Sequence, residues 1–172
     1  MDDDLETVMY EAGRALLDRD DPACAAAIRH SFTLLQERRA LDHHFYENLL
    51  KTGFDAGLEA TSAASFECLC GAALLEEKVW ELGWWYFGDL ARQMIERGFA
   101  AASEEAIAAY DQLGVRTGAV ANQNQVFSGF LALLRGMHEA KFGKVIAPVR
   151  SHDAPTKGAV KTVTMFPTEP PE

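Results

Sequence analysis

The residues best suited to chemistry in this 172-residue chain are histidines, cysteines and a run of carboxylates. Di-iron bundle proteins place Glu and His three residues apart, so that both side chains point into the bundle. No Glu lies three residues before any of the five histidines. His43 and Glu47 share one face of a helix, but such a pair supplies at most two metal ligands. We therefore interpret it as a solvated side-chain pair.

The cysteines fit neither a zinc site nor a disulfide framework. Cys68 and Cys70 are two residues apart, so on a helix they point in nearly opposite directions and cannot jointly bind zinc. We expect Cys70 in the core. With Cys24 the count is odd, and the chain opens MDDDLE rather than with a basic and then apolar run. These features predict free thiols, no signal peptide and a cytoplasmic location.

Short catalytic and nucleotide-binding motifs are also missing. The sequence contains no phosphate-binding P-loop, no GxGxxG, no CxxC and no GxSxG. A Ser or Cys nucleophile can still meet a His in space without a sequence signature, so that class stays open. The sequence predicts no metal ion and no cofactor, and it favours a non-enzymatic role.

Four carboxylates, Glu76, Glu77, Glu81 and Asp89, follow one another along a region with helical periodicity. This run resembles the carboxylate helices of all-α nucleotide pyrophosphohydrolases, in which acidic residues hold Mg²⁺. The resemblance is short, and the preceding helix offers Glu67 alone where that family has a paired acidic motif. It implies a divalent-metal-dependent phosphohydrolase as the enzymatic alternative, whereas a solvated helix face explains the same charges.

Apolar residues recur at helical spacing through residues 1–143, which predicts an all-α domain. Start and stop signals, such as Asp21 with Pro22 and the closing Gly98, divide this region into six or seven helices. We expect Asp21 to accept hydrogen bonds from the first amides of its own helix. The helices are expected near residues 4–18, from 21 onward, 42–57, from 62 onward, 79–97, 103–114 and 122–142.

The helices pair at a regular spacing. Pairs restart near residues 4, 42, 79 and 122, and a period of about 40 residues is typical of helical-hairpin repeats. Only the first pair, AGRALLDRDDPACAAAIRHSFTLL, resembles a tetratricopeptide unit, and the later pairs do not repeat its small and aromatic positions. We therefore expect a compact orthogonal bundle, with a short helical-hairpin solenoid as the alternative.

Residues 144–172 differ in character from the helical domain. They are rich in proline and have no helical period, which predicts an extended or partly disordered tail. The segment VKTVTMF, residues 160–166, is rich in β-branched residues and could add a strand to the sheet edge of a partner. Val163, Met165 and Phe166 are therefore candidate partner-binding residues. The alternative is a tail that is disordered or lies along its own domain.

The formal net charge is −10. A chain this acidic repels phosphate backbones, which argues against nucleic-acid binding and mildly favours basic partners, and plain solubility is the simpler explanation of the charge. Apolar stretches are much shorter than the ~20 residues that a membrane helix requires. We therefore expect a soluble protein that binds neither nucleic acid nor membrane.

The most informative stretch is VWELGWWYFGD, residues 79–89. Placed on one continuous helix, Trp80 and Trp84 fall on the buried stripe, whereas Trp85 falls among charged residues. Another segment of the chain, such as the tail, either covers Trp85 or leaves it to contact a partner. Tryptophan is enriched at binding hot spots because it combines a large apolar area with an N–H donor.

We therefore expect an acidic protein-interaction protein, such as an adaptor, chaperone or inhibitory subunit, that binds a protein partner or a second copy of itself. The helical candidates for this contact surround the exposed side of one helix: Leu82, Trp85, Tyr86 and Asp89. The alternative is a pocket between helices that holds an apolar small ligand. Its lining would consist of large apolar side chains, namely Trp80, Trp84, Phe87 and Met94.

Overall fold

The computed structural model describes residues 3–38 and 42–146, which form eight helices and no strand. The helices are α1 (Asp3–Leu17), α2 (Asp21–Arg38), α3 (His43–Ala56), α4 (Glu59–Leu75), α5 (Val79–Leu82), α6 (Trp84–Glu96), α7 (Ala100–Arg116) and α8 (Gln125–Phe142). The all-α prediction is confirmed. Val163, Met165 and Phe166 lie outside the described residues. None of the described helices combines the length and apolar character needed to cross a bilayer.

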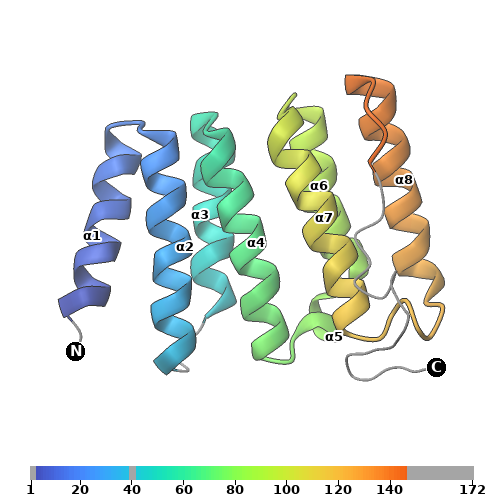
Figure 1. The fold of residues 1–172 in the computed structure, drawn as a ribbon, viewed down its shortest axis with the longest axis horizontal. Helices are drawn as coiled ribbons and strands as arrows, with labels where there is room; N and C mark the ends of the chain where they lie inside the picture. Colours follow the sequence, from blue (N-terminus) through green and yellow to red (C-terminus); the bar gives the residue numbers. More distant parts are fainter. Residues whose placement is uncertain (1–2, 39–41, 147–172) are drawn as a thin grey trace, which may run out of the picture.

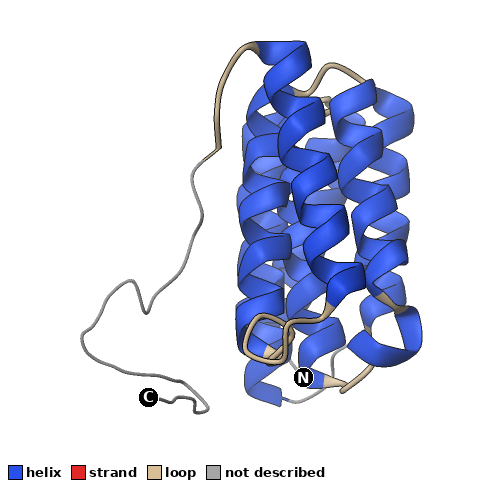
Figure 2. Cartoon of the chain, turned by 90° about the vertical axis from the view of Figure 1, so that its right-hand side faces the viewer, coloured by secondary structure: helices blue, strands red, loops and turns tan. Residues whose placement is uncertain are grey.

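The long helices run up and down side by side (Figure 1), and a view turned by 90° shows them aligned along one direction (Figure 2). Hairpins form between α1 and α2, α3 and α4, and α6 and α7, and α8 packs against α6 and α7. The first helices of these units begin at residues 3, 43, 84 and 125, which matches the period seen in the sequence. Among the described residues the arrangement is an array of helical hairpins, the alternative that the sequence left open, and not the orthogonal bundle that we expected (Figure 1).

Helix α4 lies at the centre of the array, where it packs against α2, α3 and α7. Its sequence, EATSAASFECLCGAALL, carries small or apolar residues on every face, and most of them are buried. A helix without a polar face is expected in the interior of a domain. One hydrophobic cluster extends from Ala15 in α1 to Ile146 after α8. The hairpins therefore share one main core, and a small second cluster of Val8, Ala12 and Ala27 lies between α1 and α2.

Carboxylates cap helices in the neighbouring hairpin, which corrects the prediction for Asp21. Its carboxylate accepts hydrogen bonds from the Ala60 amide, the Thr61 amide and the Thr61 hydroxyl, each at 2.7 Å, and these groups belong to α4. The amide of Ala23 in α2 instead donates to Asp20, at 3.3 Å. Capping across hairpins was missed because it depends on tertiary packing.

A carboxylate also caps a helix across the next two hairpins. The side chain of Glu59, the first residue of α4, accepts a hydrogen bond of 2.9 Å from the amide of Ala102 in α7. Neither α4 nor α7 has a capping side chain at its own N-cap residue. The N-terminal turns of α2, α4 and α7 therefore lie next to one another and are joined by carboxylates.

Gly83 divides the predicted helix 79–97 into α5 and α6. Its backbone has φ 89° and ψ 155°, a conformation that only glycine adopts readily. The break changes the direction of Trp80 relative to α6. The prediction that Trp80 belongs to the core is wrong, because its side chain is 58% exposed, whereas Trp84 is only 4% exposed.

Candidate functional site

Two tryptophans are the largest apolar side chains exposed on the described part of the chain. Trp85 is 63% exposed and Trp80 is 58% exposed. Residues 3–38 and 42–146 leave Trp85 uncovered, and most of the tail that the sequence offered as its cover lies outside these residues. Tryptophan is enriched at protein contacts, so these two side chains are the candidates for one.

Exposed apolar residues also lie on α8, which packs against α6. Phe130 of α8 lies against Gly88 of α6, since a Cβ built on Gly88 would be 2.9 Å from Cδ1 of the Phe130 ring. Val126 and Leu133, one turn before and after Phe130, lie on the same side of α8. They are 55% and 49% exposed. We call Trp80, Trp85, Val126 and Leu133 the tryptophan surface.

A buried aromatic cluster supports the tryptophan surface from beneath. The ring of Trp84 lies 4.9 Å from Phe127, 5.6 Å from Tyr110 and 5.7 Å from Trp80, measured between ring centroids. The Tyr110 hydroxyl donates to the Trp84 carbonyl at 3.2 Å. This cluster fixes the start of α6 against α7 and α8. Trp80 and Trp85 are therefore presented by a packed support.

The other predicted partner-binding residues of this helix are less accessible than Trp85. Leu82 is half-buried and packs against the core. The Tyr86 hydroxyl donates to Glu47 of α3, and the Asp89 carboxylate accepts from Arg92 and Gln93. These contacts join α6 to α3 and stabilise the helix itself.

The contact between Tyr86 and Glu47 shifts the pKa of both side chains. Burial, together with the hydrogen bond to Glu47, raises the pKa of the Tyr86 phenol. Burial acts to raise the pKa of Glu47, but hydrogen bonds from Tyr86 and His44 outweigh it, so the pKa of this carboxyl is lowered. Glu47 is therefore a carboxylate at neutral pH.

The segment that carries Trp80 and Trp85 is acidic. Residues 76–96 contain five acidic and two basic side chains. Lys78 pairs with Glu81 at 3.0 Å, and Arg92 contacts both Asp89 and Glu96. The basic residues of this segment are thus already neutralised by acidic neighbours. The region retains a net negative charge, which attracts a basic contact surface.

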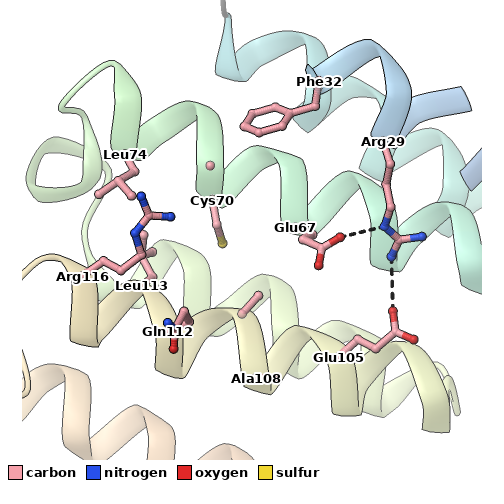
Figure 3. A pocket seen from close by; sticks show the side chains of 12 residues that line it. Arg29, Phe32, Glu67, Cys70, Leu74, Glu105, Ala108, Gln112, Leu113 and Arg116 are labelled. Carbon is pink, nitrogen blue, oxygen red and sulfur yellow. Dashed lines mark hydrogen bonds and ion pairs between the residues drawn. The ribbon is translucent and has the colours of Figure 1, made fainter. Parts of the chain in front are cut away.

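A separate groove lies between α2, α4 and α7 (Figure 3). It has a volume of about 710 Å³. Arg29 contacts Glu67 at 2.7 Å and Glu105 at 3.4 Å at one end of this α2–α4–α7 groove. Its apolar lining comes from all three helices, namely Phe32, Cys70, Leu74, Ala108, Ala109 and Leu113.

Polar groups without partners mark the other part of the α2–α4–α7 groove. Arg116 makes no ion pair with any described residue, and Figure 3 shows it beside Leu74. Oε1 of Gln112 is buried without a hydrogen-bond partner among the described residues. This groove could not be predicted, because its three helices are not consecutive in sequence.

The structure does not gather the carboxylates that resemble a magnesium site. Glu76 contacts His43, Glu81 contacts Lys78 and Asp89 contacts Arg92. Glu77 adopts φ 58° in the turn after α4. Within residues 3–38 and 42–146, none of these four carboxylates belongs to a metal-sized group of ligands.

The predicted apolar pocket is occupied by its own side chains. Phe87 and Met94 are fully buried in the core. The cysteines are also buried and unpaired, and burial raises the pKa of Cys68 to about 12 and that of Cys70 further. Thiols in this state are poor nucleophiles.

The predicted pairing of His43 with Glu47 is wrong. His43 is buried and its Nδ1 lies 3.1 Å from Oε1 of Glu76, whereas Glu47 lies 3.3 Å from Nδ1 of His44. His43 is therefore not part of a solvated pair. The sequence signal that could have drawn attention to this region is the adjacent pair His43–His44 directly after Asp42.

Comparison of the chain with protein-family models, curated proteins and solved structures finds no match. Its function is therefore inferred from the geometry described above.

Proposed function

We propose that this protein binds a basic protein partner through the tryptophan surface. The exposure of Trp85 and Trp80 carries the proposal, because Trp is enriched among the few residues that supply most of the binding energy of protein interfaces. The negative charge of residues 76–96 favours a partner with Lys or Arg at the rim of its contact. The protein would act as a non-enzymatic adaptor, chaperone or inhibitory subunit.

The exposed apolar area and the charge contribute in different ways. Burial of the two indoles would supply affinity, since each removes a large apolar surface from water. The acidic side chains would accelerate encounter and select against acidic partners. We therefore expect raised salt to slow association and leave dissociation almost unchanged.

The experiment is capture of a partner from the native host on the full chain, followed by calorimetry with the purified partner. Trp85→Ala is expected to weaken binding by at least tenfold, as for other hot-spot tryptophans. Tyr10→Ala is the matched control, because Tyr10 is an equally exposed aromatic residue on α1. Equal affinities for Trp85→Ala and the unchanged chain would contradict the proposal.

A second copy of the chain is the competing occupant of the tryptophan surface. Sedimentation equilibrium of the full chain alone separates the two cases. If the chain forms a dimer that Trp85→Ala dissociates, the tryptophan surface serves self-association and does not bind a basic partner. Two copies of this acidic segment repel each other, so we expect a monomer.

A second candidate function is binding of an elongated apolar carboxylic acid in the α2–α4–α7 groove. Arg116 favours it, because this guanidinium has no anionic partner among the described residues and adjoins an apolar lining. A ligand carboxylate could pair with Arg116 while its chain covers Leu113 and Phe32.

Palmitate is a suitable probe for the groove. Calorimetry should detect binding to the unchanged chain, and Ala108→Phe should abolish it by filling the groove from α7. Ala132→Phe is the control, since Ala132 lies exposed on α8. Palmitate binding that Ala108→Phe leaves unaltered would exclude the groove.

A further inference from the structure

Three potential metal ligands converge at the start of α3. One ligand atom from each of Asp42, His43 and His44 lies within 4.8 Å of the other two, the one such group in the part of the chain that the structure describes. The two imidazole rings are 4.1 Å apart between centroids. Asp42 is held in place as the N-cap, because its Oδ1 accepts the His44 amide at 2.9 Å.

A carboxylate lies behind each imidazole. Nδ1 of His43 is 3.1 Å from Oε1 of Glu76, whose other oxygen accepts the His43 amide at 2.7 Å. Nδ1 of His44 is 3.3 Å from Oε1 of Glu47, and the other oxygen of that carboxylate, Oε2, accepts a hydrogen bond from the Tyr86 hydroxyl. Proteins use this carboxylate–histidine arrangement to orient imidazoles that bind a metal through the other ring nitrogen.

This arrangement favours one protonation form of both rings. A carboxylate beside Nδ1 stabilises the tautomer in which Nδ1 carries the proton, so Nε2 keeps its lone pair. Each histidine can then offer Nε2 as a ligand. The supporting carboxylates come from α3 itself and from the end of α4, so the site is fixed by the packing of the second hairpin.

We propose that Asp42, His43 and His44 form a binding site for a divalent transition-metal ion of the zinc class. Two imidazoles and one carboxylate are the ligand set that suits Zn²⁺ rather than Mg²⁺ or Ca²⁺, which prefer oxygen ligands alone. Three protein ligands leave one coordination position open. The ligand atoms must approach to about 3.4 Å from one another for tetrahedral coordination. The exposed side chains of Asp42 and His44 can make that adjustment.

This metal site is separate from the proposed partner-binding surface. The sequence alone predicted no metal ion. The test is titration of the full chain with ZnCl₂ by calorimetry and with CoCl₂ by visible absorption, since tetrahedral Co²⁺ has characteristic d–d bands. We expect one ion per chain. His44→Ala should weaken binding at least tenfold, and Glu76→Gln should weaken it by roughly 10- to 100-fold because it disturbs the orienting contact.

His30→Ala is the matched control, because His30 is exposed on α2 and absent from the ligand group. His44 is also exposed, so its removal leaves the core intact, and circular dichroism of each variant verifies folding. Binding that survives His44→Ala unchanged, loss of binding in His30→Ala, or absence of any bound ion would each overturn the proposal.

Discussion

Gly114 of α7 lies directly beneath the ring of Phe127 in α8. A Cβ built at this position would be 2.1 Å from Cζ of that ring, which no packed structure allows. The absence of a side chain is therefore what lets α7 and α8 approach and support Trp84. At the residue scale, the packing beneath the tryptophan surface depends on this one contact.

We expect Gly114→Ala to lower the free energy of unfolding by about 1–3 kcal/mol, the usual range for overpacking. Urea denaturation measures it. In a Phe127→Leu background the same change should cost less, because the smaller side chain leaves room for the new methyl group. Additive costs in the double variant would show that the ring contact is not the cause.

The Tyr86–Glu47 hydrogen bond predicts a pH dependence. The folded-state pKa of Glu47 is lowered, so the stability it contributes is present above the ordinary Glu pKa of about 4.3 and is lost as the pH falls through the folded-state value. Tyr86→Phe should cost about 1.5 kcal/mol at pH 7 and progressively less as the pH falls through the folded-state pKa of Glu47. Urea unfolding over a descending series of pH values measures it, and a constant difference would contradict this assignment.

Single residues could be placed from the sequence only where the helix was placed correctly. Trp85 falls outside and Trp84 inside because both belong to the unbroken α6. Trp80 was misplaced because it precedes the break at Gly83. The ligands of the proposed metal site, Asp42, His43 and His44, are adjacent in sequence, but the carboxylate that orients His43 could not be recognised, since Glu76 follows a different helix.

At the scale of elements, Gly83 sets the boundary between α5 and α6. No atom outside its immediate neighbours lies within 4 Å of a Cβ at this position, so a substitution meets only backbone strain. Gly83→Ala should destabilise the fold by about 1–3 kcal/mol. Gly136→Ala in α8 is the control, because Gly136 is equally uncrowded but helical, and alanine should stabilise it by up to about 1 kcal/mol. Equal effects in urea unfolding would exclude the strain argument.

Asp21 predicts a second effect at this scale. Its three hydrogen bonds to the first turn of α4 should make Asp21→Ala cost about 2 kcal/mol. Asp18→Ala is the control, since Asp18 makes only an exposed contact of 3.7 Å with Arg14. Thermal unfolding compares the two, and equal midpoints would show that the cap across the hairpins contributes nothing.

The sequence predicted most helices to within a few residues, because apolar periodicity and glycine stops are local signals. It placed the start of α4 near residue 62 instead of Glu59, since the cap that begins this helix comes from Asp21. It also missed the division of α5 from α6. One glycine inside an otherwise continuous apolar pattern is compatible with an intact helix and also with a break. Only tertiary packing decides between these two outcomes.

At the scale of the whole molecule, the hairpin array raises the question of cooperativity. Arrays whose repeats contact only their neighbours can unfold in parts. Here one hydrophobic cluster runs from Ala15 to Ile146. Helix α4 packs against α2 and α3 in the N-terminal half of the array and against α7 in the C-terminal half. The grouping of α2, α4 and α7 that makes the groove also makes this continuous core. Neither feature could be predicted, because both join helices that are distant in sequence.

We therefore expect the hairpins to unfold together. All three tryptophans lie in residues 80–85, so tryptophan fluorescence reports on α5 and α6, whereas circular dichroism reports on every helix. Ile28→Ala removes a fully buried side chain from α2, with an expected cost of about 2–5 kcal/mol. In a cooperative unit this distant change moves the fluorescence and circular dichroism midpoints together, and Leu134→Ala in α8 moves them in the same way. A fluorescence midpoint that Ile28→Ala leaves in place would instead show that the N-terminal hairpin unfolds on its own, because the contacts of α4 would then fail to couple the two halves.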